Sequence, residues 1–177
     1  MLPILTYPHD ALTRPALPVP HVTPEVVELA QEMVASMRAA GGVGLAAPQV
    51  GSSLRLIVLE YAATRPEERA DAFPLQILLN PKLISAGREQ DTMAEGCLSL
   101  PGIEVPVSRA TKVKVRAETL EGQTIQFRAH GFHARALQHE LDHLAGTLIL
   151  DYAKNRRQLL RQYEQARTQA PPSSSRL

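Results

Sequence analysis

The chain has 177 residues, 44% of them hydrophobic, which suits one domain with a substantial core. A single cysteine excludes an internal disulfide and fits a reducing compartment. No stretch is long and apolar enough to span a membrane, and the start of the chain does not resemble a signal peptide, so we expect a cytoplasmic protein without a membrane partner. The formal net charge of +1 is unevenly spread. Residues 151–177 carry six Lys or Arg against two acidic residues, a charge of +4, which leaves −3 for the rest.

The start of the chain predicts an extended wrapping segment followed by a packing helix. Five prolines keep residues 1–20 extended. A helix is expected to begin after Thr23, a typical N-cap residue, with Pro24 in its first turn, and to end at Gly41 and Gly42. We assign no chemistry to this helix.

A glycine-rich segment, residues 42–51, comes next. It has neither the lysine of a P-loop nor the glycine spacing of a dinucleotide-binding turn. Its small residues allow another backbone to approach closely, and Gln49 provides a neutral side-chain donor. An ordinary loop leading into a strand at 54–60 fits the composition equally well, so both interpretations stay open.

The region after this strand predicts a polar excursion and two short strands. Residues 61–73 are polar and should lie on the surface. Strands are then expected at 77–80 and 82–86, separated at Pro81. The segment that contains Cys97 follows.

A β-hairpin is predicted from strict alternation of polar and apolar residues. The alternation covers residues 112–117 and 124–127, with Glu121 and Gly122 between them. One face of this hairpin should be solvated. Its lysines and arginines are explained by that exposure and need no further role.

The segment with most chemical content follows the hairpin. His139 and His143 are four residues apart, so on a helix they lie on one face, one turn apart. Both imidazoles can then reach one metal ion, with Glu140 beside them to handle protons. Residues 134–141 contain no helix breaker, and Gly146 provides a stop. A buried helix with two incidental histidines is the simpler interpretation, but the complete His-Glu-x-x-His pattern favours a metal site.

Three positions compete to be the third metal ligand. The extension of the motif that adds a third histidine fails, because Ile149 occupies that position. Glu164 is the only glutamate after His143, but it lies among basic residues typical of a solvated helix face. Cys97, beside Gly96, is the better ligand. A thiolate and two imidazoles leave one tetrahedral position open, as in catalytic sites.

The C-terminal part predicts a second, basic helix from about residue 154 to 168, followed by a tail at 169–177. We therefore expect one domain at residues 1–168, with its basic helix within 151–168. The fold class is α+β, with small mixed or antiparallel sheets around a central metal-binding helix and with helices near both ends.

Three segments together resemble the three motifs of peptide deformylases, in the same order and spacing. They are Gly42-Val43-Gly44-Leu45-Ala46-Ala47-Pro48-Gln49, Glu95-Gly96-Cys97-Leu98-Ser99 and Gln138-His139-Glu140-Leu141-Asp142-His143. The likeness extends from Ile4 to Tyr152 and is closest to the type common in Gram-negative bacteria.

The resemblance implies an activity and a cofactor. The family hydrolyses the N-formyl group from the initiator methionine of nascent polypeptides and releases formate, using a metal-bound hydroxide. Cys97, His139 and His143 would hold one metal ion per chain, natively Fe²⁺, with Zn²⁺, Ni²⁺ or Co²⁺ as possible substitutes.

The resemblance and general chemistry also assign roles beside the metal. Glu140 would transfer the proton from water to the departing amine. The Gln49 side-chain amide and the Leu98 backbone N–H would stabilise charge on the formyl oxygen. Glu95 is expected to accept a hydrogen bond from a ligating histidine, with Arg109 steadying it.

Substrate contacts are expected on two sides of the metal. Val43 and Gly44 would pair with the peptide backbone like an added strand, as would the stretch after Leu98. Phe132 and Ala136 are candidates for the wall of the methionine pocket, with Arg135 at its rim.

The ribosome is the second expected partner. In similar bacterial enzymes the C-terminal helix contacts the ribosome near the exit tunnel, and here Arg156, Arg157 and Arg161 give that helix a basic surface. A solvated face is the alternative for these arginines.

Two other function classes remain possible on the residues alone. A structural zinc site in a binding module is disfavoured, because such sites have four ligands and Glu140 would then have no role. A general metallopeptidase would use Glu164 as a ligand and would tolerate loss of Cys97.

Overall fold

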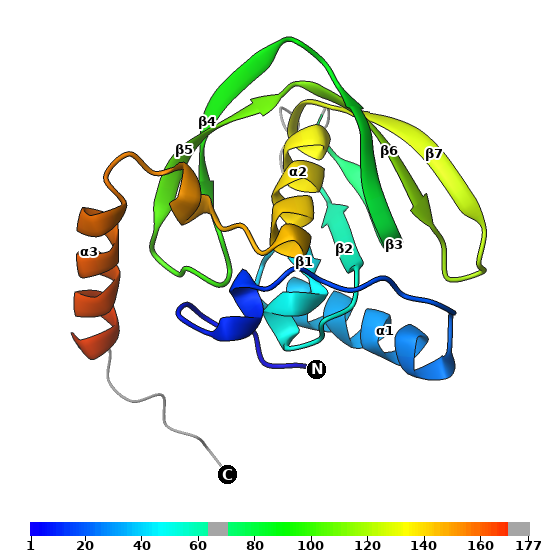
Figure 1. The fold of residues 1–177 in the computed structure, drawn as a ribbon, viewed down its shortest axis with the longest axis horizontal. Coiled ribbons are helices and arrows are strands. Elements are labelled where there is room, and N and C mark those ends of the chain that lie inside the picture. Colours follow the sequence, from blue (N-terminus) through cyan, green and yellow to red (C-terminus); the bar gives the residue numbers. More distant parts are fainter. Residues whose placement is uncertain (64–70, 170–177) are drawn as a thin grey trace.

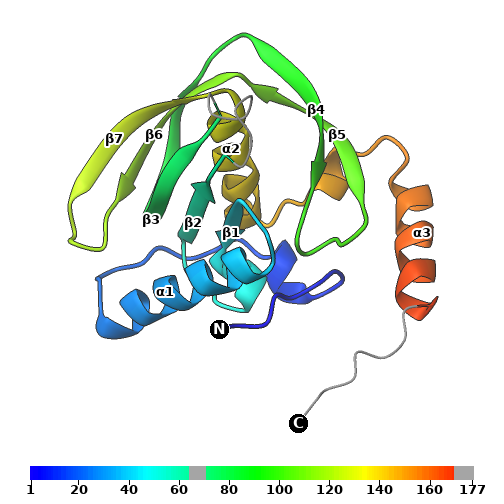
Figure 2. The ribbon, with the colours of Figure 1, turned by 180° about the vertical axis from the view of Figure 1, so that it is seen from behind.

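Helix α2 (Gly131–Ala145) lies in the angle between two antiparallel β-sheets, at the centre of the molecule (Figures 1 and 2). The computed structural model describes residues 1–63 and 71–169. Most of the predicted surface excursion at 61–73 and nearly all of the tail at 169–177 lie outside these residues. The α+β class and the central helix predicted from the sequence are confirmed.

Seven strands in the described ranges form the two sheets. The larger sheet has the order β1-β2-β3-β6-β7, and the smaller pairs β4 with β5. Their bounds are β1 (Gly44–Ala46), β2 (Leu56–Tyr61), β3 (Phe73–Ala86), β4 (Gln90–Gly96), β5 (Glu104–Ala110), β6 (Lys112–Glu118) and β7 (Thr124–His130). Strand β1 is therefore an edge strand, with one side open to an added chain.

The other helices flank this frame. They are α1 (Pro24–Ala39), α3 (Arg156–Gln169) and the short 3₁₀ helices η1 (Asp10–Thr13), η2 (Ala47–Val50) and η4 (Ile149–Tyr152). Helix α1 follows Thr23 and precedes Gly41 (φ 66°), as predicted, although the Thr23 side chain makes no cap hydrogen bond. Its apolar face packs on β1 and β2. No helix in the described ranges is long and apolar enough to cross a membrane.

Two features of the sheets differ from the sequence prediction. The expected break at Pro81 does not divide the strand. Strand β3 continues through it with a register shift between Leu79 and Lys82, where Asn80 adopts φ 50°. Because proline lacks an N–H, it is tolerated at such an irregularity. The pairing of β4 with β5 was not predicted.

Helix α2 is fixed by apolar packing and by the hydrogen bonds of one side chain. Its apolar residues Ala134, Leu137 and Leu144 are fully buried against the larger sheet. The Gln138 side chain donates to the Ala110 carbonyl at 2.9 Å and accepts from the Ala110 N–H at 3.2 Å. The helix thereby holds a fixed rotation between the sheets, which determines where its histidines point.

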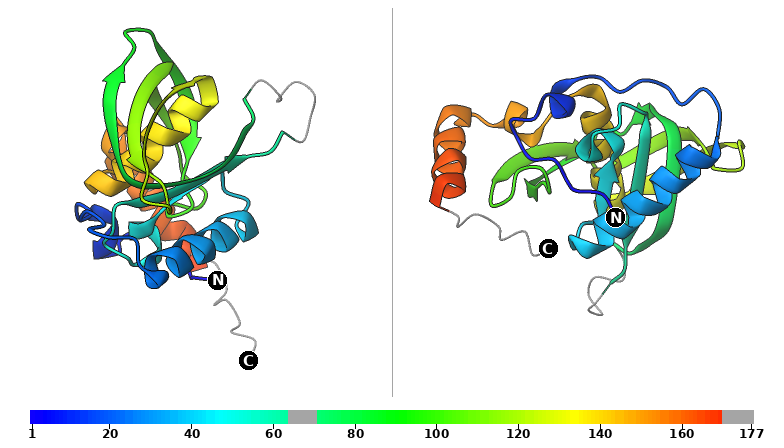
Figure 3. Two further views of the ribbon diagram at one scale, coloured as in Figure 1. Left: turned by 90° about the vertical axis from the view of Figure 1, so that its right-hand side faces the viewer. Right: turned by 90° about the horizontal axis from the view of Figure 1, so that it is seen from below.

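The extended N-terminal segment joins parts of the chain that are distant in sequence (Figure 3). The Leu5 N–H donates to the Gln49 carbonyl at 2.7 Å, and the Tyr7 N–H donates to the Ser99 carbonyl at 3.0 Å. The carbonyl of Tyr7 in turn accepts from the Tyr163 hydroxyl of α3 at 3.1 Å. The predicted wrapping segment therefore links η2, the loop at Ser99 and the C-terminal helix.

Candidate active site

Cys97, His139 and His143 converge at one point between the smaller sheet and α2. One ligand atom from each residue lies within 4.8 Å of those of the other two. Cys97 Sγ lies 3.2 Å from His143 Nε2. Ligand atoms that share a tetrahedral metal at ordinary bond lengths are separated by about 3.3–3.6 Å. The three residues therefore fit a single small divalent ion with little movement.

A buried carboxylate, Glu95, orients this cluster from behind. It accepts two hydrogen bonds from the Arg109 guanidinium, each at 2.8 Å, and one from Arg135 at 2.7 Å. Its Oε2 also lies 3.0 Å from His139 Nδ1. Burial alone would raise the pKa of Glu95, but the hydrogen bonds from Arg109 and His139 hold it at about 2.

The protonation of the two histidines follows from these contacts. Because an ionised Glu95 can only accept, His139 Nδ1 carries a hydrogen and Nε2 faces the cysteine. Burial opposes a charge on His139, but hydrogen bonds with Cys97 and Glu95 raise its pKa to about 10. Burial lowers the pKa of His143 well below its usual value, so this ring is neutral. A bound cation would replace the proton that His139 holds here.

Glu140 adjoins the ligand cluster and is itself buried. Burial raises its pKa to about 7, and its Oε2 has no hydrogen-bond partner among the described residues. The side chain lies against Gly44, where an added Cβ would meet Glu140 Oε1 at only 2.4 Å. A carboxyl group with a pKa near neutrality and a free oxygen is suited to proton transfer.

Gln49 lies on the other side of the cluster with its carboxamide orientation fixed. Its Oε1 accepts from the Ala46 N–H at 2.8 Å, while Nε2 lies 3.1 Å from Ser99 Oγ and 3.7 Å from Cys97 Sγ. One amide hydrogen therefore points towards the ligand cluster. The Leu98 N–H donates no hydrogen bond within the described parts of the chain, so a second donor is available next to Cys97.

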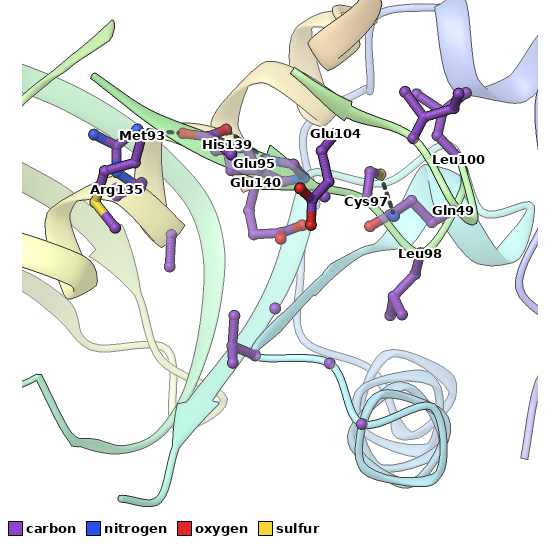
Figure 4. Close-up of a pocket in the computed structure, with 18 of the residues that line it drawn as sticks. Gln49, Met93, Glu95, Cys97, Leu98, Leu100, Glu104, Arg135, His139 and Glu140 are labelled. Carbon is purple, nitrogen blue, oxygen red and sulfur yellow. Dashed lines mark hydrogen bonds and ion pairs between the residues drawn. The ribbon is translucent and has the colours of Figure 1, made fainter. Parts of the chain in front are cut away.

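These groups open into a hollow of about 640 Å³ (Figure 4). Val43, Gly44, Phe132 and Ala136, expected at the substrate, all line it. Arg135 lines it too, but the prediction that it lies at the rim is wrong. Its side chain is 7% exposed and bonds to Glu95 and to the backbone of β4 and β5, because a buried guanidinium must be paired.

Sequence reasoning missed several residues of this site. Asp142 accepts from Arg109 at 2.6 Å, and the Ser99 hydroxyl holds Gln49. Both residues lie within the motif segments, one or two positions from an expected metal ligand. That proximity was the signal in the sequence that could have identified them. Met93 and Glu104 reach the hollow only through the pairing of β4 with β5, which no local pattern revealed.

The family was established by comparison with known proteins. A sequence model described as polypeptide deformylase matches residues 1–159. The chain belongs to the peptide deformylase family. The peptide deformylase of Dictyoglomus thermophilum is 48% identical over 136 residues, which are 76% of this chain and 81% of that protein. That of Desulforudis audaxviator is 43% identical over 150 residues, 85% of this chain and 92% of that protein.

Solved peptide deformylases share the fold. The crystal structure of the enzyme from Ehrlichia chaffeensis superposes with a TM-score of 0.87 at 30% identity, covering 95% of this chain and 97% of that one. A second structure of that enzyme, in complex with actinonin, gives a TM-score of 0.86. The predicted activity, hydrolytic removal of the N-formyl group from nascent polypeptides by a metal-dependent enzyme, is the activity of this family.

Replacement of Glu95 by Gln should lower stability and change its dependence on pH. In the wild type the Glu95 pKa is about 2 when folded and near 4.3 when unfolded. The stabilisation that the Glu95 carboxylate gives the folded state is therefore complete above about pH 5 and is lost as the pH falls towards 2. Glu95→Gln should lower the free energy of unfolding by about 3 kcal/mol at pH 7, because two buried arginines lose their counter-charge. It should also weaken metal binding, because His139 loses the carboxylate that orients its ring.

Urea unfolding between pH 2.5 and 7 measures this effect, with Asp91→Asn as the control. Asp91 also approaches Arg135, at 3.8 Å, but is 59% exposed, so its loss should matter little. Equal stability of Glu95→Gln and the wild type at pH 7 would refute the role assigned to this carboxylate.

Proposed function

We propose that the chain deformylates nascent peptides with Cys97, His139 and His143 as metal ligands and Glu140 as the proton-transfer group. The observation that carries this proposal is the buried Glu140 carboxylate with a free oxygen, beside three converging ligand atoms in an open hollow. When bound, a divalent metal acidifies a water molecule and polarises a carbonyl oxygen. The remaining steps fall to side chains and backbone groups of this chain.

Glu140 accepts the proton of the attacking water and delivers it to the amine that leaves. A pKa of about 7 suits both transfers near neutral pH. Charge that develops on the formyl oxygen is stabilised by the Gln49 amide and the Leu98 N–H. These donors are held in place before the reaction, so no reorganisation is needed as the charge forms.

The peptide backbone is proposed to lie along the open edge of β1. Val43 and Gly44 line the hollow there, and β1 is paired on its other side only, with β2. An extended peptide can add to such an edge through main-chain hydrogen bonds. Phe132 and Ala136 then contribute to the apolar surface that receives the methionine side chain.

Substitution of Glu140 and of Cys97 should have separable effects. Glu140→Gln should fold and retain metal, because Glu140 is not a ligand, while kcat on a formyl-methionyl peptide falls on the order of 10²-fold or more. Cys97→Ala should lose bound metal as well as activity. Formate release measured together with metal content decides the roles, and a metal-loaded Glu140→Gln enzyme with wild-type turnover would contradict them.

The native metal is proposed to be Fe²⁺. A thiolate with two imidazoles accepts both iron and zinc, so the support comes from the family resemblance. Anaerobic reconstitution of the metal-free protein with Fe²⁺, Zn²⁺, Ni²⁺ or Co²⁺ should give the Fe²⁺ enzyme a higher rate than the Zn²⁺ enzyme. The Fe²⁺ enzyme should lose activity in air as iron or the thiolate oxidises. Zinc that matches iron without oxygen sensitivity would exclude this assignment.

We propose that helix α3 binds a cytoplasmic ribosome near its exit tunnel. The helix would be the C-terminal part of a domain that ends near residue 168. Arg157 and Arg161 are exposed on α3, and Arg156 pairs with Asp151 at its start. Tyr163 is 2% exposed and anchors the helix through its hydroxyl to Tyr7. The basic residues are therefore left on the outer surface.

Charge reversal in α3 should separate ribosome binding from catalysis. The variant Arg156→Glu, Arg157→Glu, Arg161→Glu should co-sediment with ribosomes at least tenfold less than the wild type, because the phosphate contacts are lost. Its turnover on a short formyl-methionyl peptide should stay close to wild type. Unchanged co-sedimentation would mean that α3 serves only as scaffold.

A further inference from the structure

The outer face of β3, β6 and β7 carries a concentration of positive charge that deformylation does not use. Its cations are Lys82, Lys112, Lys114, Arg116 and Arg128, called here the sheet cations. Four are exposed and Lys114 is partly exposed. They point away from α2, because the residues that alternate with them, Val113, Val115 and Ala117, are buried against that helix. None of the sheet cations lines the catalytic hollow.

The strand register places like charges directly opposite one another. Lys82 is paired with Arg116 across β3 and β6, and Lys114 with Arg128 across β6 and β7. Side chains at such positions have Cβ atoms about 4.5–5.5 Å apart, and like charges there destabilise a sheet. Selection for stability alone would favour an acidic residue at one of the two positions in each pair.

No ion pair neutralises the sheet cations within the described parts of the chain. Glu118 is the only acidic residue in the three strands, and its carboxylate accepts from Asn80 at 3.4 Å. None of the sheet cations forms an ion pair with a described residue. The face is therefore complementary to a polyanion.

A shallow hollow at one end of the face adds a further cation. Arg55, Lys82 and Arg116 line it together with Glu118, and its volume is about 240 Å³. Arg55 donates through Nη2 to the Pro81 carbonyl at 2.7 Å, while its buried Nε has no partner among the described residues. Arg55 is partly buried, and its charge adds to those of Lys82 and Arg116 around the hollow.

We propose that this face binds double-helical RNA through its phosphates. Phe73 and Phe127 pack towards α2, and the exposed ring of the three strands is His130, opposite Lys112 at the end of β7. A single imidazole is not the extended stacking surface used for single strands. Rows of cations on a broad sheet face fit the phosphate backbone and shape of a duplex. Deformylation of nascent polypeptides takes place beside ribosomal RNA, which is rich in such helices.

This surface is distinct from the one proposed on α3. The strands β6 and β7 lie at one end of the molecule and α3 at the other (Figures 1 and 2). The two contacts would reinforce each other on one particle by raising effective concentration. The proposal does not depend on the roles assigned to Glu140 or to the metal ligands.

The test uses Lys82→Glu, Lys114→Glu in the full-length enzyme. Each new glutamate faces an arginine across the sheet, so both repulsive pairs become ion pairs, and Tm should equal or exceed that of the wild type. Binding to a fluorescein-labelled 20-base-pair RNA duplex is measured by anisotropy at 50 and 200 mM KCl. Affinity at 50 mM should fall at least tenfold, and the slope of log K against log salt should shrink by about 2, at roughly 0.9 per lost contact.

Two further variants keep the result interpretable. Arg14→Glu, Arg38→Glu changes the net charge equally at exposed positions outside both the sheet face and α3, and its duplex affinity should fall less than threefold. Lys82→Gln, Lys114→Gln removes the cations without creating ion pairs and should lose an intermediate amount of affinity. Both double variants of the sheet should keep wild-type turnover on a short formyl-methionyl peptide.

Three outcomes would overturn the proposal. If the wild type fails to bind the duplex at 50 mM KCl, the face is only solvated. If the Arg14→Glu, Arg38→Glu variant and the glutamate variant of the sheet lose equal affinity, net charge alone is responsible. If the wild type binds vesicles containing phosphatidylglycerol and not the duplex, the partner is a membrane surface.

Discussion

The hydrogen bonds around the Glu95 carboxylate connect the smaller sheet to the helix that carries His139 and His143. Glu95 belongs to β4, Arg109 to β5, and Arg135 and His139 to α2, so one carboxylate joins the smaller sheet to the central helix. Separating these partners would leave a charge buried without compensation, which costs several kcal/mol. The relative placement of Cys97, which follows β4, and the two histidines of α2 is therefore fixed by electrostatics as well as by apolar packing.

Glu95 and Glu140 show how environment separates two carboxylates close to the same histidine. Glu95 receives hydrogen bonds from two guanidinium groups, and its pKa is held at about 2. Glu140 is buried without such donors, and its pKa is raised to about 7. One group can therefore serve as a permanent negative charge while the other exchanges protons near neutrality. Because Arg109 and Arg135 are saturated by Glu95 and the neighbouring groups, neither competes for Glu140.

The sequence was most informative where the chemistry is local. Helical spacing located α2 and the side of it that carries His139 and His143, and turn residues located the β6–β7 hairpin. The β4–β5 pairing was not predicted, because Gln90–Gly96 is largely exposed and polar and β5 contains Pro106. Pairing of that kind depends on tertiary contacts rather than on local preference. The burial of Arg135 could not be foreseen for the same reason, since its partners lie on those two strands.

The contact between Gly44 and Glu140 limits how this pocket can diversify. Residue 44 has no side chain, and any Cβ would collide with the carboxylate before it reached a ligand. The wall formed by β1 is thus pure backbone, and a point mutation cannot reshape it without displacing Glu140. A ligand that takes its affinity from the backbone at residue 44 would contact atoms that no substitution there can change without displacing Glu140. Variation in the shape of this pocket is therefore expected elsewhere in its lining, from side chains such as Met93 and Leu100.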